Sequence, residues 1–289
     1  MSALLAELLV PFGYNYMLKA MWVSALVGGV CAFLSAYLML KGWSLMGDAL
    51  AHSIVPGVAG AYIIGAPFAV GAFFAGIVAA LAMQFVRQKS RLREDAVIGL
   101  VFTALFALGL LMASIWPTSV SIQTIVLGNI LAISDEDVVQ VAAIAGVSLT
   151  ILAFIWKDLM ITFFDESHAR SIGIRTGVLK IIFFTLLSAC TVAALQTVGA
   201  CLVIAMVVTP GATAYLLTDR FGRLILISIA LGVGTSFLGA YLSYFVDGAT
   251  GGVIVTLQTL VFLAAFIFAP KHGMLAARRR RIAGSEIAA

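Results

Sequence analysis

Apolar runs of about 20 residues, the length at which a helix crosses the roughly 30 Å hydrocarbon core of a bilayer, follow one another along this chain. They limit its fold more than any other feature. Of the 289 residues, 63% are hydrophobic and only 10% are charged, whereas an ordinary soluble domain has about 25% charged residues. We therefore predict an all-α, polytopic membrane helix bundle that forms a single transmembrane domain over residues 1–289.

The runs define nine candidate spans, or eight if one neighbouring pair forms a single broken helix. They lie at residues 17–40, 46–65, 67–86, 96–115, 137–156, 178–196, 198–217, 224–246 and 252–269. An apolar piece at 120–133 is too short to cross the membrane. We expect it to dip into the bilayer and return, with other protein covering its backbone.

Lysine and arginine residues occur in alternate connections between the predicted spans. They gather near residues 87–93, 157–175, 220–223 and 271–281, and the connections near 66, 116–136, 197 and 247–251 have none. By the positive-inside rule, the basic side is cytoplasmic, so a basic tail at 270–289 lies inside and the N-terminus lies outside. The net charge of +4 therefore reflects topology and contact with the lipid bilayer, and nucleic acid is not an expected partner.

Two ionisable residues, Asp48 and His52, lie inside the second apolar run. Residues four apart share a helix face, and a charge at the centre of a membrane helix costs roughly 2.5–3.5 kcal/mol, so such residues are read as functional. A carboxylate oxygen and an imidazole nitrogen suit Mn²⁺, Fe²⁺ or Zn²⁺. The stretch between Gly47 and Gly65 has no Cys or Met, the soft ligands that Cu(I) prefers, so Cu(I) is disfavoured. The alternative is an Asp–His hydrogen bond that only joins two helices, and the spacing leaves both interpretations open.

Proline–glycine pairs interrupt two of the predicted helices. Pro56 and Gly57 follow His52 in the second run, and Pro210 and Gly211 lie in the seventh. Because a proline removes a helical hydrogen bond, it frees carbonyl groups that can line a pathway. We therefore predict discontinuous or cavity-facing helices at both places, since transport proteins often build a site from broken helices.

The connection at about 163–175 contains a short polar helix on the basic side of the membrane, which ends at Gly173. Ala169, Ile172 and Gly173 share one of its faces. From the residues alone, an ordinary solvated connector is the favoured interpretation.

The sequence lacks the usual signatures of catalysis. It has no Gly-x-x-x-x-Gly-Lys phosphate loop, so the chain is not expected to hydrolyse nucleotide by that machinery. It has no His-Glu-x-x-His motif, and no second deep aspartate pairs with Asp48. We therefore assign no catalytic residue and no permanently bound cofactor.

The order of these motifs resembles the transmembrane subunits of bacterial manganese, zinc and iron importers of the ATP-binding-cassette class, the cluster-9 permease family. The likeness covers nearly the whole chain and is carried by residues 38–57, 94–99, 164–173, 198–203, 210–214, 257–259 and 268–270. One departure is Lys41-Gly42, where members of that family often have two basic residues.

The resemblance implies a vitamin-B12-importer-like (type II) permease with eight to nine transmembrane helices in the bacterial cytoplasmic (inner) membrane. It also implies a dimer of permeases, identical or different, that works with two cytoplasmic ATPase subunits and an external metal-binding solute-binding protein. In such a complex, ATP binds to the partner subunits. Asp48 and His52 would coordinate the passing metal ion, with Mn²⁺ ranked first, Fe²⁺ second and Zn²⁺ third.

The resemblance also changes the interpretation of the connection at about 163–175. It would be the coupling helix that docks on the ATPase, and its residues in that role would be Asp165, Glu166, Ala169, Arg170 and Gly173.

Two other functions remain as alternatives. One is a proton-coupled secondary metal transporter, in which Asp48 and His52 carry protons. The other is an intramembrane metal-dependent hydrolase, for which the sequence supplies neither a third fixed ligand nor a general base.

Overall fold

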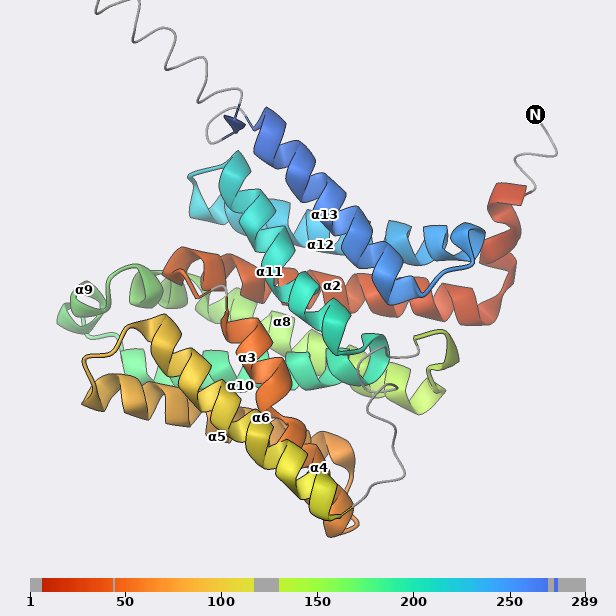
Figure 1. The fold of residues 1–289 in the computed structure, drawn as a ribbon. Helices are drawn as coiled ribbons and strands as arrows, with labels where there is room; N and C mark the ends of the chain where they lie inside the picture. The colour runs from red at the N-terminus through yellow and green to blue at the C-terminus, as the bar shows by residue number, and fades with distance from the viewer. Residues whose placement is uncertain (1–6, 44, 117–129, 270–272, 275–289) are drawn as a thin grey trace, which may run out of the picture. The chain divides into compact units, whose positions relative to one another are not determined.

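The computed structural model describes residues 7–43, 45–116, 130–269 and 273–274. These residues form helices, with no strand among them (Figure 1). Seven of the described helices are long and apolar enough to cross a membrane, and one further apolar helix is shorter. The predicted all-α, polytopic membrane bundle is therefore confirmed.

The elements in chain order are η1 Val10–Gly13, α2 Asn15–Lys41, α3 Met46–Ser53, α4 Val55–Ile63, α5 Phe68–Lys89, α6 Glu94–Ile115, η2 Ile130–Ala132, α8 Asp135–Phe164, α9 Glu166–Ser171, α10 Thr176–Val198, α11 Ala200–Leu217, α12 Phe221–Val246 and α13 Thr250–Phe268. Most of the predicted re-entrant piece at 120–133 lies outside the described residues, as does most of the basic tail at 270–289.

The second apolar run forms two short helices, as its proline predicted. α3 ends at Ser53 and α4 begins at Val55, with Pro56 in the first turn of α4. Because proline has no N–H to donate to the carbonyl four residues earlier, which is that of His52, the first helix stops here. The site residues of α3 therefore lie just before a helix break.

The seventh run differs from the expectation, because α11 continues through Pro210 without a break. Ser35 of α2 accepts a hydrogen bond from the Gly211 N–H at 3.0 Å and donates one to the Val208 carbonyl at 3.1 Å. These bonds satisfy backbone groups on both sides of the proline, so the loss of one helical hydrogen bond does not end the helix. The predicted break at Pro210 and Gly211 is therefore wrong.

The chain divides into two compact units, residues 1–39 with 205–289 and residues 40–204, and each has its own close helix contacts. In the first unit, α2 packs against α12 through small residues. A Cβ on Gly28 would overlap Gly232 and Ser236, and Ser228 Oγ donates a hydrogen bond to the Ala32 carbonyl at 2.7 Å. Small residues at such contacts let membrane helices approach closely.

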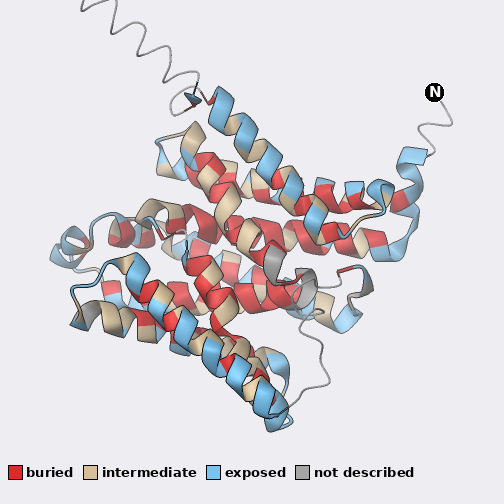
Figure 2. Cartoon of the chain, viewed as in Figure 1, coloured by how far each residue is buried: buried red, intermediate tan, exposed pale blue. Residues whose placement is uncertain are grey.

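In the second unit, α3 packs against α5, α6 and α10, and α4 packs against α5 and α6. Gly57 of α4 and Gly71 of α5 approach so closely that a Cβ on either would overlap the other backbone, and Gly109 of α6 lies against Val55 and Pro56. Much of α6 is exposed on its other side (Figure 2). Its exposed apolar residues suit contact with lipid, and they include Leu100, Leu108 and Leu111.

Candidate functional site

The short helix α3 presents Asp48 and His52 on one face. Every other residue of α3 is buried, whereas the side chains of Asp48 and His52 are 38% and 33% exposed. His52 Nε2 lies 3.3 Å from Asp48 Oδ1. The structure therefore brings together the two donor groups as their spacing predicted, and it leaves both accessible.

Two aromatic rings of α6 enclose His52. The ring centroid of His52 lies 5.6 Å from that of Phe102 and 5.4 Å from that of Phe106. At a rise of 1.5 Å per residue, these phenylalanines lie about 12 and 18 Å along α6 from Glu94. α6 begins at Glu94, directly after basic residues. His52 therefore lies beside the apolar middle of α6 and away from its basic end.

As metal ligands, the two side chains would make an incomplete set. Within the described ranges, no group of three or more His, Cys, Asp or Glu side chains converges on one point. Asp48 and His52 would supply one oxygen and one nitrogen, and the described residues would leave the remaining positions around a cation to other ligands. Such an arrangement suits brief binding better than permanent retention.

The other residues predicted to break pathway helices fall in different units. Pro56 and Gly57 lie at the start of α4, directly after α3, whereas Pro210 and Gly211 belong to the first unit. A role for these four residues in a transport pathway stays a prediction.

The connection between α8 and α10 folds into the short helix α9, and two residues define its ends. The carboxylate of Asp165 accepts hydrogen bonds from two backbone N–H groups of the first turn, at 2.9 and 3.0 Å. Gly173 follows the helix with a φ of +87°, a conformation that favours glycine. The sequence therefore specifies where α9 begins and where it ends.

Glu166 joins α9 to α10. Its carboxylate contacts Arg170 of α9 and Lys180 of α10, each at 2.5 Å. Burial raises the pKa of Glu166, but hydrogen bonds and charges from Lys180 and Arg170 outweigh this effect, so the pKa lies below its usual value. The carboxylate is therefore ionised at neutral pH and holds both cations.

Three of the five residues predicted to contact an ATPase, Asp165, Arg170 and Gly173, are exposed, and Glu166 is half-buried. Ala169 is buried, and Asp165, Glu166 and Gly173 shape the helix. Two large apolar side chains around α9 are also exposed: Phe164 at 79% and Ile172 at 53%. The sequence signal for Phe164 is an aromatic residue beside a polar connector, which is hard to distinguish from the end of a span. The contact role of the five predicted residues stays a prediction.

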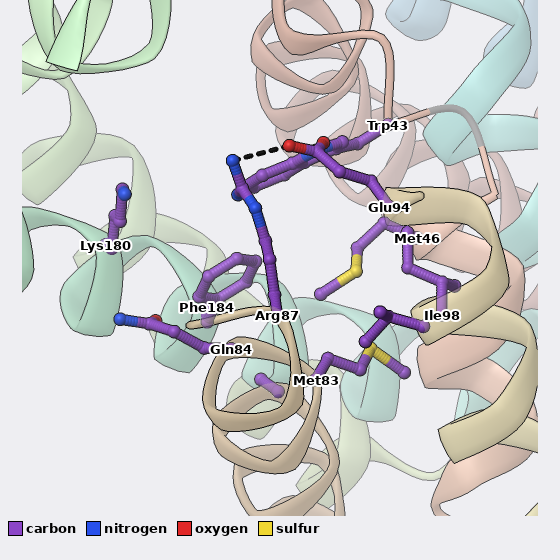
Figure 3. Close-up of a pocket in the computed structure, with 11 residues that line it drawn as sticks. Trp43, Met46, Met83, Gln84, Arg87, Glu94, Ile98, Lys180 and Phe184 are labelled. Carbon is purple, nitrogen blue, oxygen red and sulfur yellow. Dashed lines mark hydrogen bonds and ion pairs between the residues drawn. The ribbon is translucent and has the colours of Figure 1, made fainter. Parts of the chain in front are cut away.

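Sequence reasoning missed a cavity in the second unit. Arg87 of α5 points toward Glu94, with which it forms an ion pair at 2.5 Å (Figure 3). The indole Nε1 of Trp43 also donates a hydrogen bond to Glu94, and the Arg87 guanidinium lies 5.4 Å from the Trp43 ring centroid. The cavity is lined by Trp43, Met46, Ala80, Met83, Gln84, Arg87, Glu94, Val97, Ile98, Lys180 and Phe184.

The sequence signal at Glu94 suggested only an acidic residue at a helix start, where negative charge is favoured. The structure gives Glu94 two side-chain partners in addition. These partners come from separate segments, so no local pattern could identify them.

Comparison with known proteins shows relatives along almost the whole chain. The chelated iron transport system membrane protein YfeC of Yersinia pestis is 72% identical over 277 residues, which are 96% of this chain and 94% of that protein. The manganese transport system membrane protein MntB of Synechocystis is 47% identical over 274 residues, which are 95% of this chain and 90% of that protein.

A solved structure gives the same result for the fold. A chain of PsaBC from Streptococcus pneumoniae, in complex with Fab, superimposes with a TM-score of 0.83 at 32% identity, over 95% of this chain and 99% of that chain. The model of the ABC 3 transport family matches residues 13–269. The chain therefore belongs to the ABC 3 transport family.

Proposed function

We propose that this chain is the membrane-spanning permease subunit of an ATP-driven importer of divalent metal ions in the bacterial cytoplasmic membrane. The observation that carries the proposal is the Asp48–His52 pair, 3.3 Å apart on the accessible face of α3 in a member of a transport family. Relatives at 72% and 47% identity are named as iron and manganese transport system membrane proteins, which supports a metal as the cargo.

The cargo is a hard or borderline divalent cation, Mn²⁺ or Fe²⁺, with Zn²⁺ as the third candidate. A carboxylate and an imidazole accept all three ions. The ranking of Mn²⁺ above Fe²⁺ has no support from the relatives, since the protein at 72% identity is named for chelated iron. We therefore propose both ions as cargo.

The proposal requires three kinds of partner. Cytoplasmic ATPase subunits bind and hydrolyse ATP, because this chain has no phosphate loop. A second permease subunit, identical or different, supplies the other half of the pathway and further positions around the cation. An external solute-binding protein delivers the metal ion.

The region around α9 suits contact with the ATPase. Phe164 and Ile172 expose apolar surface beside α9, which the Glu166–Lys180 ion pair joins to α10. Exposed apolar groups can mark protein contacts; Ile172 lies outside the candidate spans, and Phe164 is the last residue of one of them. When the ATPase changes shape on binding ATP, α9 moves with it, and the permease changes from outward-facing to inward-facing.

Reconstitution tests the proposal. The chain is produced with its ATPase partner and placed in vesicles with the external binding protein, and uptake of Mn²⁺, Fe²⁺ and Zn²⁺ is measured separately. We expect ATP-dependent uptake and metal-stimulated ATP hydrolysis only in the complex. Uptake by the isolated chain under a proton gradient would overturn the proposal in favour of a secondary transporter.

A further inference from the structure

The carboxylate of Glu94 connects three elements around the candidate metal site. Glu94 is the first residue of α6, the helix whose Phe102 and Phe106 enclose His52. It forms an ion pair with Arg87 in the last turn of α5. It also accepts a hydrogen bond from Trp43, which lies between α2 and α3.

Trp43 is fixed to the beginning of α3. The N–H of Met46, the first residue of α3, donates a hydrogen bond to the Trp43 carbonyl at 3.1 Å. The indole ring is buried, stacks on Phe184 of α10 at 5.6 Å and meets Phe163 of α8 edge-on at 5.5 Å. The residue that carries this ring is therefore hydrogen-bonded to the start of α3, two residues before Asp48.

Lys180 reaches the same cavity from α10. Its side chain is 9% exposed, and its ammonium pairs with Glu166 of α9 at 2.5 Å. Arg87 and Lys41 are the neighbouring cations that act on it. If α9 moves and Glu166 leaves, a buried ammonium is left beside two positive charges, which is a costly arrangement.

Glu94 lines the same cavity as Lys180 and is paired with Arg87. It supplies the carboxylate among the residues that line the cavity with Lys180. The cavity has about 400 Å³ of empty space, its open mouth included, and Met46 and Met83 line it with flexible side chains that adapt to movement. Figure 3 shows Lys180 and Glu94 on opposite sides of Arg87.

We propose that Lys180 and Glu94 are positioning residues that carry the movement of α9 to α3. When α9 moves, Lys180 exchanges Glu166 for Glu94, Glu94 releases Trp43, and the start of α3 shifts together with Asp48. This inference rests on the proposed function, because it requires an ATPase that moves α9.

A double-mutant cycle in the reconstituted complex tests the inference. Trp43→Phe removes the N–H donor but keeps an aromatic ring, and Lys180→Met removes the ammonium but keeps an apolar chain. The measurement is the number of metal ions imported per ATP hydrolysed, in samples with equal amounts of assembled complex. We expect each variant to lower this ratio about tenfold, a usual size for coupling between sites, and the double variant to be no worse than the lower single variant.

Among the described residues, no hydrogen bond joins Trp43 directly to Lys180. If the two substitutions acted independently, their losses in the ratio would therefore multiply. Multiplication of the two losses, or an unchanged ratio in both single variants, would overturn the inference. Lys180→Arg keeps the charge and should restore most of the ratio, which a purely steric role would not predict. Ile181→Val, a conservative change at the exposed residue next to Lys180 on α10 and outside the cavity lining, serves as the matched control and should leave the ratio unchanged.

Glu94→Gln provides a second variant in case Lys180→Met does not assemble. It keeps an acceptor for Trp43 but loses the charge that attracts Lys180, so the ratio should again fall about tenfold. ATP-dependent uptake by the wild-type complex tests the proposed function separately. If the wild type imports metal and the cycle multiplies, only the inference fails, and if the wild type does not import metal, both fail.

Discussion

Replacing Asp48 and His52 one at a time by alanine distinguishes a metal site from a structural clip. The two side chains are 3.3 Å apart, and each is about one third exposed. Both lie on α3, so a purely structural role would be that of an exposed i,i+4 pair within one helix, which contributes about 0–1 kcal/mol. Since 1.4 kcal/mol is a factor of ten in an equilibrium constant, such a clip changes any equilibrium by about fivefold at most.

A ligand role predicts a much larger effect. Loss of groups that merely support a metal ligand already costs 10–100-fold in affinity or activity, so loss of one of two protein ligands should lower uptake by at least about 100-fold. The stability of the complex should hardly change, because the exposed pair contributes so little to it. The two interpretations therefore differ by more than tenfold in uptake.

The assay is ATP-dependent uptake of radioactive Mn²⁺ into vesicles that contain equal amounts of assembled complex. Leu45→Ala is the matched control, because Leu45 is 49% exposed and lies one turn before Asp48 on the same face, but offers no metal ligand. Uptake within fivefold of the wild type in both Asp48→Ala and His52→Ala would refute the ligand role.

Three further predictions concern the packing and the ATPase contact. Phe164→Ser should reduce co-purification of the ATPase about tenfold or more, as for a large apolar contact residue, whereas Phe154→Ser, equally exposed but in the middle of α8, should not. Gly57→Leu should lower stability by about 1–3 kcal/mol or more in thermal unfolding, because its side chain would overlap Gly71, and Gly146→Leu, with open space around it, should leave the unfolding temperature unchanged. The pKa of Glu166 is lowered in the folded protein. Its stabilising effect should therefore be complete above the usual glutamate pKa of about 4.3 and be lost as the pH falls through the lowered value. The measurement is the difference in unfolding temperature between the wild type and Glu166→Gln, and a difference that already shrinks between pH 7 and 6 would contradict this.

The fold was predictable where a local pattern determines the outcome. Apolar runs of about 20 residues match the length of a helix that crosses a bilayer. Pro56 has no N–H to donate, so the break at Ile54 could be anticipated. The same reasoning failed at Pro210, where the hydroxyl of Ser35 bonds to the backbone around it. Whether a proline ends a helix depends on such a distant partner, which a linear sequence does not identify.

The candidate site divides in the same way. Asp48 and His52 could be paired from their spacing, because four residues make one turn of a helix. Trp43, Glu94 and Lys180 lie in segments far apart in the chain, and only the folded arrangement places them around one cavity. Residues that shape a short helix, such as Gly173, were easier to predict than the surface it presents, because caps follow local rules and surfaces depend on neighbouring elements.

As the proposed metal ligands, Asp48 and His52 also bear on where metal selectivity would arise. For a given set of nitrogen and oxygen ligands, affinity generally rises from Mn²⁺ to Fe²⁺ and is higher still for Zn²⁺. One carboxylate and one imidazole therefore cannot favour Mn²⁺ over its competitors, and a third fixed ligand would slow the release that transport requires. We expect the ion to be selected before it reaches α3, by the external binding protein, so that the pair accepts whichever ion is delivered. Such tolerance fits a site whose relatives are named for iron and for manganese.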